Sequence, residues 1–157
     1  PDFKFIEILR SMKIPLTHDG SKLTVMKAKL IHPIDCNLNS TPDLFPVLAV
    51  LAAFAKGESK LWGAPHLAFK ESNRIEKTRE LLAKAGINSA AKEDGLIVYG
   101  EAAEKIDRQF DFDTDHDHRM AFAAGLLKLK GANINILNPQ VVSKSFPEFW
   151  QFLGVKP

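Results

Sequence analysis

Residues 45–56, FPVLAVLAAFAK, and residues 119–130, RMAFAAGLLKLK, are two alanine-rich segments that lie 74 positions apart in a chain of 157 residues. We interpret both as helices, each stopped by a Lys-Gly pair and followed by a short strand and by a lysine that opens another helix. The charged residues around them recur at the same offset: Asp43 and Asp117, Lys56-Gly57 and Lys130-Gly131, Lys70 and Lys144. Self-similarity at a fixed offset is typical of repeated supersecondary units. The sequence therefore predicts two copies of one unit, with a site where equivalent loops converge.

The segments that flank these helices repeat as well. Apolar residues at helical spacing predict a helix, which is followed by a short strand (Ile14-Pro15-Leu16 in the first copy, Gly86-Ile87 in the second), by an Asp-Gly turn signal and then by the alternating pattern of a second strand. This order occurs twice, at an offset of 73 to 75 positions: helix 3–12, turn Asp19-Gly20 and strand 23–30, then helix 75–85, turn Asp94-Gly95 and strand 96–99. A third copy of the helix starts at residues 146–153.

The fold prediction is therefore an α/β domain built of strand–helix–strand–helix–strand–strand units. The two units cover about residues 3–70 and 71–145, and residues 146–157 start a third element. No low-complexity run or Gly/Ser linker separates the copies, so we expect residues 1–157 to form one compact domain. The chain begins with proline rather than methionine, which leaves open that it is a piece of a longer protein.

Composition excludes several classes of protein. A hydrophobic content of 45% with 25% charged residues is ordinary for a soluble globular domain. The net charge of +2 leaves no polybasic field for a nucleic-acid partner. The single cysteine, Cys36, excludes an internal disulfide and a multi-cysteine metal site, and it fits a reducing compartment such as the cytoplasm. The longest apolar stretch, residues 45–55, is too short to span a bilayer, so we expect no membrane partner.

Helix starts are marked by residues that cap them. Thr41-Pro42-Asp43 offers a threonine cap, a proline in the first turn and an acid at the positive end of the helix dipole. Asn73–Glu76 and Ser145–Glu148 both have the spacing of a capping box. Lys70 and Lys144 each lie just before such a start. Because helix N-termini bind anions, a lysine there makes a phosphate or carboxylate pocket plausible.

Charged clusters at two of these helix starts are candidates for a site. Residues 70–74, KESNR, are either a solvated, capped helix end or part of an anion site. Arg119 opposes the dipole of its helix, so it is either neutralised by an anionic ligand or paired at the surface with Asp115 or Asp117. Taken alone, each cluster is also compatible with an ordinary protein surface.

Taken together, four motifs are specific: PDLFPVLAVLAAFAKG at 42–57, KESNRI at 70–75, DHRMA at 117–121 and KSFPEF at 144–149. In order and spacing, nearly the whole chain resembles the C-terminal portion of the 5-enolpyruvylshikimate-3-phosphate (EPSP) synthases, or 3-phosphoshikimate 1-carboxyvinyltransferases. The resemblance implies two similar domains, each built of three of the repeat units, that close on a cleft. This chain would hold two of the three units of the C-terminal domain, and the N-terminal domain is absent from it.

The resemblance also implies an activity. Members of the family transfer the enolpyruvyl group of phosphoenolpyruvate to the 5-hydroxyl of shikimate 3-phosphate and release phosphate, in the biosynthesis of chorismate and the aromatic amino acids. Carboxylates are needed to move protons, and several cations are needed because two phosphates and a carboxylate gather in one cleft. No cofactor and no metal are implied. We expect the full-length enzyme to be a cytoplasmic monomer.

Two carboxylates carry the proton transfers in this interpretation. Asp43 matches the acid that contacts the shikimate ring and accepts a proton, and Glu71 matches the carboxylate implicated in proton transfer at the methylene carbon. Lys70 matches a residue that binds shikimate 3-phosphate. His66 falls where the family often has a polar contact to the same substrate.

Three cations match those that hold phosphoenolpyruvate: Arg74, Arg119 and Lys144. The planar fork of arginine suits a carboxylate or phosphate because it donates two parallel hydrogen bonds. His118 is expected to support Arg119 rather than to take part in the chemistry.

The chain departs from the family pattern in two respects. The family usually has aspartate where this chain has Asn73, although the two residues are nearly equivalent as helix caps. The other domain of the family supplies a lysine, serines, a glutamine and a further arginine to the same cleft, and nothing in this chain matches them. Because orientation of the substrates is a large part of the rate, we expect the chain to be inactive alone.

Three alternatives remain. The related enzyme that transfers enolpyruvate to UDP-N-acetylglucosamine is the nearest, but KESNR and KSFP favour the shikimate enzyme. A phosphate-binding or RNA-end-processing relative of the same fold is opposed by the modest net charge and by the lack of interleaved aromatic and basic residues. A purely structural or regulatory half-domain would make the four ordered motifs an accident.

Overall fold

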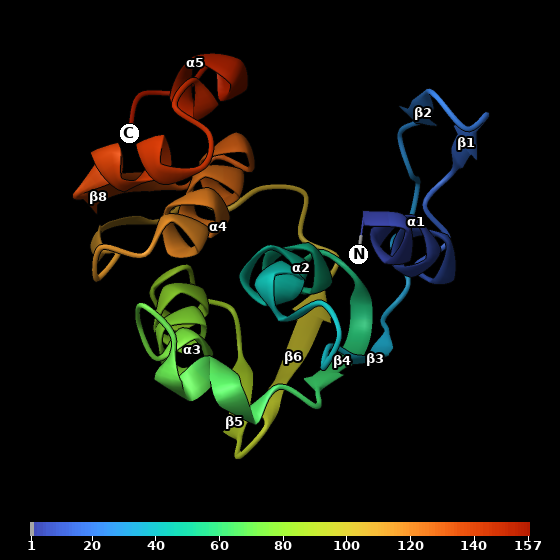
Figure 1. The fold of residues 1–157 in the computed structure, drawn as a ribbon, viewed down its shortest axis with the longest axis horizontal. Coiled ribbons are helices and arrows are strands. Elements are labelled where there is room, and N and C mark those ends of the chain that lie inside the picture. Colours follow the sequence, from blue (N-terminus) through green and yellow to red (C-terminus); the bar gives the residue numbers. More distant parts are fainter. Residues whose placement is uncertain (1) are drawn as a thin grey trace.

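Three helices pack against one another; two of them also pack on the larger sheet and the third on a smaller one (Figure 1). They are α2 (Phe45–Ala53), α3 (Arg74–Lys84) and α4 (His118–Leu129). The computed structural model describes residues 2–157; Pro1, which the domain prediction includes, lies outside the described residues. The alanine-rich segments therefore form internal helices rather than a surface layer.

In the described part of the chain, the strands form three sheets. The largest has the order β3-β4-β6-β5, in which β3 runs parallel to β4 and the other pairs are antiparallel. Strands β7 and β8 form a parallel pair, and β1 and β2 form an antiparallel hairpin. The strand bounds are β1 Leu16–His18, β2 Leu23–Val25, β3 Asp35–Asn37, β4 Lys56–Trp62, β5 Ser89–Lys92, β6 Gly95–Glu101, β7 Gln109–Asp113 and β8 Asn133–Leu137.

Shorter helices join these parts. Helix α1 lies on the same side of the molecule as the β1–β2 hairpin (Figure 1). Helix α5 packs against α4 near the C-terminus. Three 3₁₀ helices precede or follow the main helices in the chain. The bounds are α1 Asp2–Ser11, η1 Pro42–Leu44, η2 Pro65–Phe69, η3 Pro139–Lys144 and α5 Phe149–Leu153. None of the helices in the described residues is both long enough and apolar enough to cross a bilayer.

The composition of α2 and α4 explains why they lie inside. Helix α2 has no polar residue, and α4 is apolar between Arg119 and Lys128, so over these stretches neither helix has a polar face for water. In α2, Phe45 and Leu48 have no exposed surface, and in α4 the same holds for Met120 and Leu127. Alanines between these large side chains let the helices approach closely. The helix starts that carry the polar residues are therefore fixed by a packed interior.

The four-stranded sheet has one buried face and one open face. Ser59 and Leu61 of β4 point to the helices and are buried, whereas Lys60 and Trp62 alternate with them and are exposed. Such alternation is typical of an antiparallel sheet that packs on a core with one side only. The charged residues of the open face thus lie apart from the helix starts.

The elements recur in the order expected from the repeat. β3, α2, β4 and η2 are followed at about the same offset by β7, α4, β8 and η3. In each set the two strands that flank the helix pair in parallel. The number of units in a complete domain stays a prediction.

Four local expectations were wrong. The strand predicted over 23–30 is confined to β2, because the residues after it leave the hairpin. The first Lys-Gly pair does not stop a helix: α2 ends at Ala53, and Lys56-Gly57 belongs to β4. Thr41 makes no side-chain cap, since α2 is preceded by the 3₁₀ turn η1. Ser145 does not cap α5, because that helix begins four residues later, at Phe149.

Candidate active site

Three helix starts meet at one place, and each brings a charged residue to it. Asp43 lies in η1, directly before α2, and Arg74 is the first residue of α3. Asp117 is the N-cap of α4, and Arg119 lies in the first turn of that helix. Because the N-terminal ends of helices carry partial positive charge, this junction favours anions. The four side chains are joined by the contacts described next.

Arg74 is the centre of this cluster. Its side chain is only 3% exposed, and its Nε donates a hydrogen bond to Oδ2 of Asp117 at 2.7 Å. Its Nη2 donates to Oδ1 of the same carboxylate at 3.2 Å, so Asp117 is bound by a two-pronged contact. Nη1 donates to Oδ1 of Asp43 at 2.8 Å. Arg74 therefore links the start of α2 to the start of α4.

The buried pair is charged. Burial opposes ionisation of Arg74 and Asp117, but hydrogen bonds and charge from the partner outweigh it. The pKa of Arg74 is raised above its ordinary value, and the pKa of Asp117 is lowered below its ordinary value. Both groups stay ionised at neutral pH.

Arg119 contacts a different acid from the two expected at the surface. Its Nη2 donates to Oδ2 of Asp43 at 3.3 Å, while Asp117 accepts only its backbone N–H, at 2.9 Å. Asp115 is paired instead with Lys77, at 3.1 Å. The buried Nε of Arg119 has no hydrogen-bond partner among the described residues. An unsatisfied buried donor is costly, and this one lies beside the acids of the cluster.

Glu71 forms a second cluster beside the first. Its Oε2 lies 3.6 Å from Nζ of Lys144 and 3.2 Å from Nδ1 of His118. Lys144 also donates to the backbone oxygen of His116, at 3.3 Å. The expectation that His118 supports Arg119 is therefore wrong: the imidazole contacts Glu71, because it points from the start of α4 toward the loop before α3.

The two clusters belong to one site. Single ligand atoms of Glu71, Asp117 and His118 all lie within 4.8 Å of one another. This group has donors of the kind that bind metals, but both oxygens of Asp117 are already engaged by Arg74. A cation there would have to compete with a buried arginine for the same carboxylate. The arrangement suits an anionic ligand better than a metal.

The structure thus brings together five of the seven predicted site residues: Asp43, Glu71, Arg74, Arg119 and Lys144. His66 lies in η2 and Lys70 directly follows it. Among the described residues, neither has a hydrogen bond or ion pair to the cluster. Asp117 was missed as a site residue, although its position, equivalent to Asp43 in the repeat, was the available signal.

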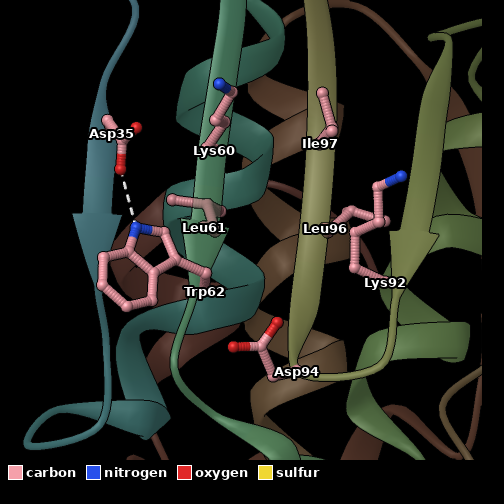
Figure 2. Close-up of a pocket in the computed structure, with 8 residues that line it drawn as sticks. All are labelled: Asp35, Lys60, Leu61, Trp62, Lys92, Asp94, Leu96 and Ile97. Atoms are coloured by element: carbon pink, nitrogen blue, oxygen red, sulfur yellow. Dashed lines mark hydrogen bonds between the residues drawn. The ribbon is translucent and has the colours of Figure 1, made fainter.

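A separate hollow of about 310 Å³ lies on the open face of the four-stranded sheet (Figure 2). Trp62 and Asp35 form one side of it, joined by a 2.6 Å hydrogen bond from the indole N–H to the carboxylate. Lys60, Lys92 and Asp94 surround the rest. No residue of the cluster at the helix starts lines this hollow, and its mixed charges favour no single class of ligand.

Comparison with known proteins agrees with the fold and with the motifs. The family model described as EPSP synthase (3-phosphoshikimate 1-carboxyvinyltransferase) matches residues 1–153. Among curated relatives, the 3-phosphoshikimate 1-carboxyvinyltransferase of Syntrophobacter fumaroxidans is 36% identical over 150 residues, 96% of this chain and 35% of that protein. The protein of the same name from Archaeoglobus fulgidus is 37% identical over 154 residues, 97% of this chain and 36% of that protein. The chain belongs to the EPSP synthase family.

Solved structures show the same relationship. An EPSP synthase from Acinetobacter baumannii superposes with a TM-score of 0.87 at 28% identity, over 95% of this chain and 37% of that one. The enolpyruvyl transferase NikO from Streptomyces tendae, at 18% identity and a TM-score of 0.66, shares the fold, over 96% of this chain and 34% of that one. The predicted resemblance and the enolpyruvyl transferase fold are therefore confirmed. The chain spans about a third of the length of the relatives it matches.

Proposed function

We propose that this chain supplies one wall of the substrate cleft of an enolpyruvyl transferase. The reaction is transfer of the enolpyruvyl group of phosphoenolpyruvate to the 5-hydroxyl of shikimate 3-phosphate, with release of phosphate. One observation carries the proposal: Arg74, Arg119 and Lys144 each contact one of two carboxylates, Asp43 and Glu71, at the meeting point of three helix starts. Family membership and the names of the relatives support it.

The three cations would bind phosphoenolpyruvate through its carboxylate and phosphate. In the structure, Asp43 pairs with Arg74 and Arg119, and Glu71 pairs with Lys144. A substrate with both a carboxylate and a phosphate would bind these cations in place of Asp43 and Glu71, because charge-assisted hydrogen bonds to arginine are strong. The unpartnered Nε of Arg119 offers one donor that needs no exchange.

Exchange would release the two carboxylates for chemistry. The side chain of Asp43 is 50% exposed. It would accept the proton of the 5-hydroxyl while the oxygen of that hydroxyl attacks C2 of the enolpyruvyl group. Glu71, released from Lys144 and protonated, would donate the proton that is added to the methylene carbon. The tetrahedral adduct then loses phosphate from C2 and a proton from the new methyl group, which restores the double bond. The methyl proton would return to Glu71, and the proton held by Asp43 would leave with the phosphate, so that both carboxyl groups regain their starting protonation.

Lys70 and His66 would hold the phosphate of shikimate 3-phosphate, because both lie in the segment that leads from β4 to α3 and so to Glu71. The remaining contacts would come from the N-terminal domain of the full-length enzyme, which would close over the helix starts. We propose that the full-length enzyme is a monomer of the cytoplasm without a partner nucleic acid, and that residues 1–157 are a part of its C-terminal domain.

The test is calorimetric titration of the full-length parent with shikimate 3-phosphate and then phosphoenolpyruvate, together with assay of phosphate release. Asp43→Ala is expected to lower kcat by about 10²–10⁴-fold, as for loss of a group that transfers a proton. Lys144→Ala is expected to raise KM for phosphoenolpyruvate. Lys60→Ala, on the open face of the sheet, is the control and should leave both unchanged.

Two results would contradict the proposal. A parent that ignores shikimate 3-phosphate but turns over a UDP-sugar would be the related UDP-N-acetylglucosamine enolpyruvyl transferase. A parent that binds neither substrate would be a non-catalytic relative, and binding of RNA ends would then be the next measurement.

A further inference from the structure

Asp117 is a buried carboxylate whose oxygens are all committed. It has no exposed surface, and Oδ2 accepts hydrogen bonds from Nε of Arg74 at 2.7 Å and from Oγ of Ser72 at 3.0 Å. Oδ1 accepts from Nη2 of Arg74 at 3.2 Å and from the backbone N–H of Arg119 at 2.9 Å. No oxygen of this group is left to act as a base or to bind a ligand.

The contacts of Asp117 fix the orientation of Arg74. The carboxylate occupies the Nε–Nη2 edge of the guanidinium, so only the Nη1 corner and the outer edge beside it can meet another anion. At present the Nη1 corner faces Asp43, which is half exposed. The buried acid therefore presents one defined edge of Arg74 to the open side of the cluster.

The same carboxylate also sets the position of Arg119. By accepting the backbone N–H of Arg119, it caps α4 and fixes where that helix begins. Asp115 and His116, directly before it, have φ values of +50° and +58°, a left-handed conformation that is uncommon outside glycine. Two successive residues thus have this left-handed conformation, and the side chain of the next residue, Asp117, points inward. One side chain thus holds one arginine by its guanidinium and the other by its backbone.

We propose that Asp117 is a positioning residue: it holds Arg74 and Arg119 at the separation that lets both grip one bound substrate carrying a carboxylate and a phosphate. The inference rests on the proposed function of the site. Asp117 itself touches neither substrate nor reacting atoms. Its role differs from that of its repeat equivalent, Asp43, which binds both arginines from the exposed side.

A purely structural role predicts something different. A buried ion pair that only stabilises the junction would, once broken, lower the melting temperature and the fraction of active enzyme. It would leave the KM of the remaining active molecules unchanged. A positioning role predicts a selective loss of affinity for the substrate that the two arginines bind.

The experiment compares Asp117→Asn with the control Asp115→Asn in the full-length parent. Asn keeps the shape of Asp117 but lacks its charge, and Asp115 is an exposed neighbour that pairs with Lys77 outside the site. We expect Asp117→Asn to raise KM for phosphoenolpyruvate at least about tenfold while KM for shikimate 3-phosphate changes less than about twofold, which corresponds to about 1.4 kcal/mol of selective binding. Asp115→Asn should change neither.

A second variant covers the case in which Asp117→Asn does not fold. Ser72→Ala removes one donor to Asp117 without removing charge, and it should raise KM for phosphoenolpyruvate in the same direction by a smaller factor, about two- to threefold, the equivalent of about half a kcal/mol. An NMR measurement adds a readout independent of turnover. The Nε–H signal of Arg74, assigned by its loss in Arg74→Lys, should be protected from exchange in wild type and should lose that protection in Asp117→Asn.

Each outcome of these experiments tests either the positioning role of Asp117 or the proposed function. An unchanged KM for phosphoenolpyruvate in the folded variants, or an Nε–H signal that stays protected in Asp117→Asn, overturns the positioning role even when the parent is fully active. A wild-type parent that neither binds nor turns over phosphoenolpyruvate refutes the proposed function instead, and the role of Asp117 in it falls at the same time.

Discussion

Arg74 shows how a buried charge can be kept in a mostly apolar interior. Its guanidinium is almost completely removed from water, and removal of a charge from water costs several kcal/mol. Two carboxylates, one on each side, offset that cost through three hydrogen bonds. The guanidinium lies between Asp43 at the start of α2 and Asp117 at the start of α4.

The first prediction concerns the stability of this buried pair. Arg74→Met leaves Asp117 buried without its partner, so we expect the free energy of unfolding to fall by about 3–5 kcal/mol. Arg79→Met is the matched control, because Arg79 lies on the same helix and pairs with Glu76 in solvent, with its side chain 46% exposed. Its loss should cost at most about 1 kcal/mol. Urea unfolding of both variants measures the free energies of unfolding, and equal losses in the two variants would contradict the stabilising role of the Arg74–Asp117 pair.

The second prediction concerns pH. Burial would raise the pKa of Asp117, but hydrogen bonds and charge from Arg74 lower it below its ordinary value of 3.8. Because the folded pKa is the lower one, this stabilisation is fully present above about pH 4 and is lost as the pH falls through the folded pKa. We therefore expect wild type to lose stability more steeply than Asp117→Asn as the pH falls below about 4. Thermal unfolding across this range tests it, and Asp115→Asn should follow wild type.

At the scale of single elements, the starts of the helices decide where the site residues lie. Helix α3 begins at Arg74 because Asn73 caps it: the side-chain oxygen of Asn73 accepts the backbone N–H of Glu76, at 3.2 Å. The first turn of α3 therefore holds Arg74 at the junction with α2 and α4. Here the capping half of the predicted box is confirmed, while the side chain of Glu76 pairs with Arg79.

The third prediction tests this cap. Asn73→Ala removes the acceptor, so we expect the free energy of unfolding to fall by about 1 kcal/mol. Asn73→Asp restores the residue that the family usually has, and it should be neutral or slightly stabilising because a negative charge suits the helix N-terminus. Differential scanning calorimetry of the two variants measures this. A loss of stability in Asn73→Asp as large as in Asn73→Ala would mean that the amide makes a contact other than the cap.

At the scale of the whole molecule, the charges of the cluster balance without a ligand. Three cations and three acids meet at the helix starts: Arg74, Arg119, Lys144, Asp43, Glu71 and Asp117. In the proposed function, an anionic substrate replaces the internal carboxylates at these cations. One wall can hold the exchanged groups, but it cannot by itself fix two substrates relative to each other.

The fourth prediction follows from that geometry. We expect residues 1–157 alone to release no phosphate from phosphoenolpyruvate and shikimate 3-phosphate under conditions in which the full-length parent is active, because orientation of the reactants supplies a large part of the rate. The measurement is a phosphate-release assay of both proteins at equal concentration. Turnover by the isolated chain would show that this wall is sufficient.

Much of the architecture could be predicted from periodic patterns. The alanine-rich segments became α2 and α4, and the helix expected over 75–85 became α3, within one residue at each end. Predictions of helix caps failed where a neighbouring turn, rather than the capping residue itself, set the start of the helix. Thr41 does not cap α2 because a 3₁₀ turn comes between them, and its buried hydroxyl has no hydrogen-bond partner within residues 2–157. Ser145 lies at the end of η3, so its distance from α5 is set by that turn.

The pairing of charges was beyond prediction for a physical reason. Arg74 and Asp117 are 43 positions apart, and Arg119 and Asp43 are 76 apart. No local pattern links residues at such separations, and several acids lie nearer in sequence to each arginine. Asp115 precedes Arg119 by four positions, yet it turns to Lys77, because the left-handed backbone at Asp115 and His116 directs it away.

The sequence by itself determined the repeated order of elements, the internal helices and the membership of charged motifs in one family, because hydrophobic periodicity and fixed spacing are local properties of the chain. Only the tertiary structure decided which carboxylate binds which arginine, that Asp117 is buried while Asp43 is half exposed, and that His118 contacts Glu71. These depend on how α2, α3 and α4 pack, since a packed interior brings together helix starts that the chain keeps far apart.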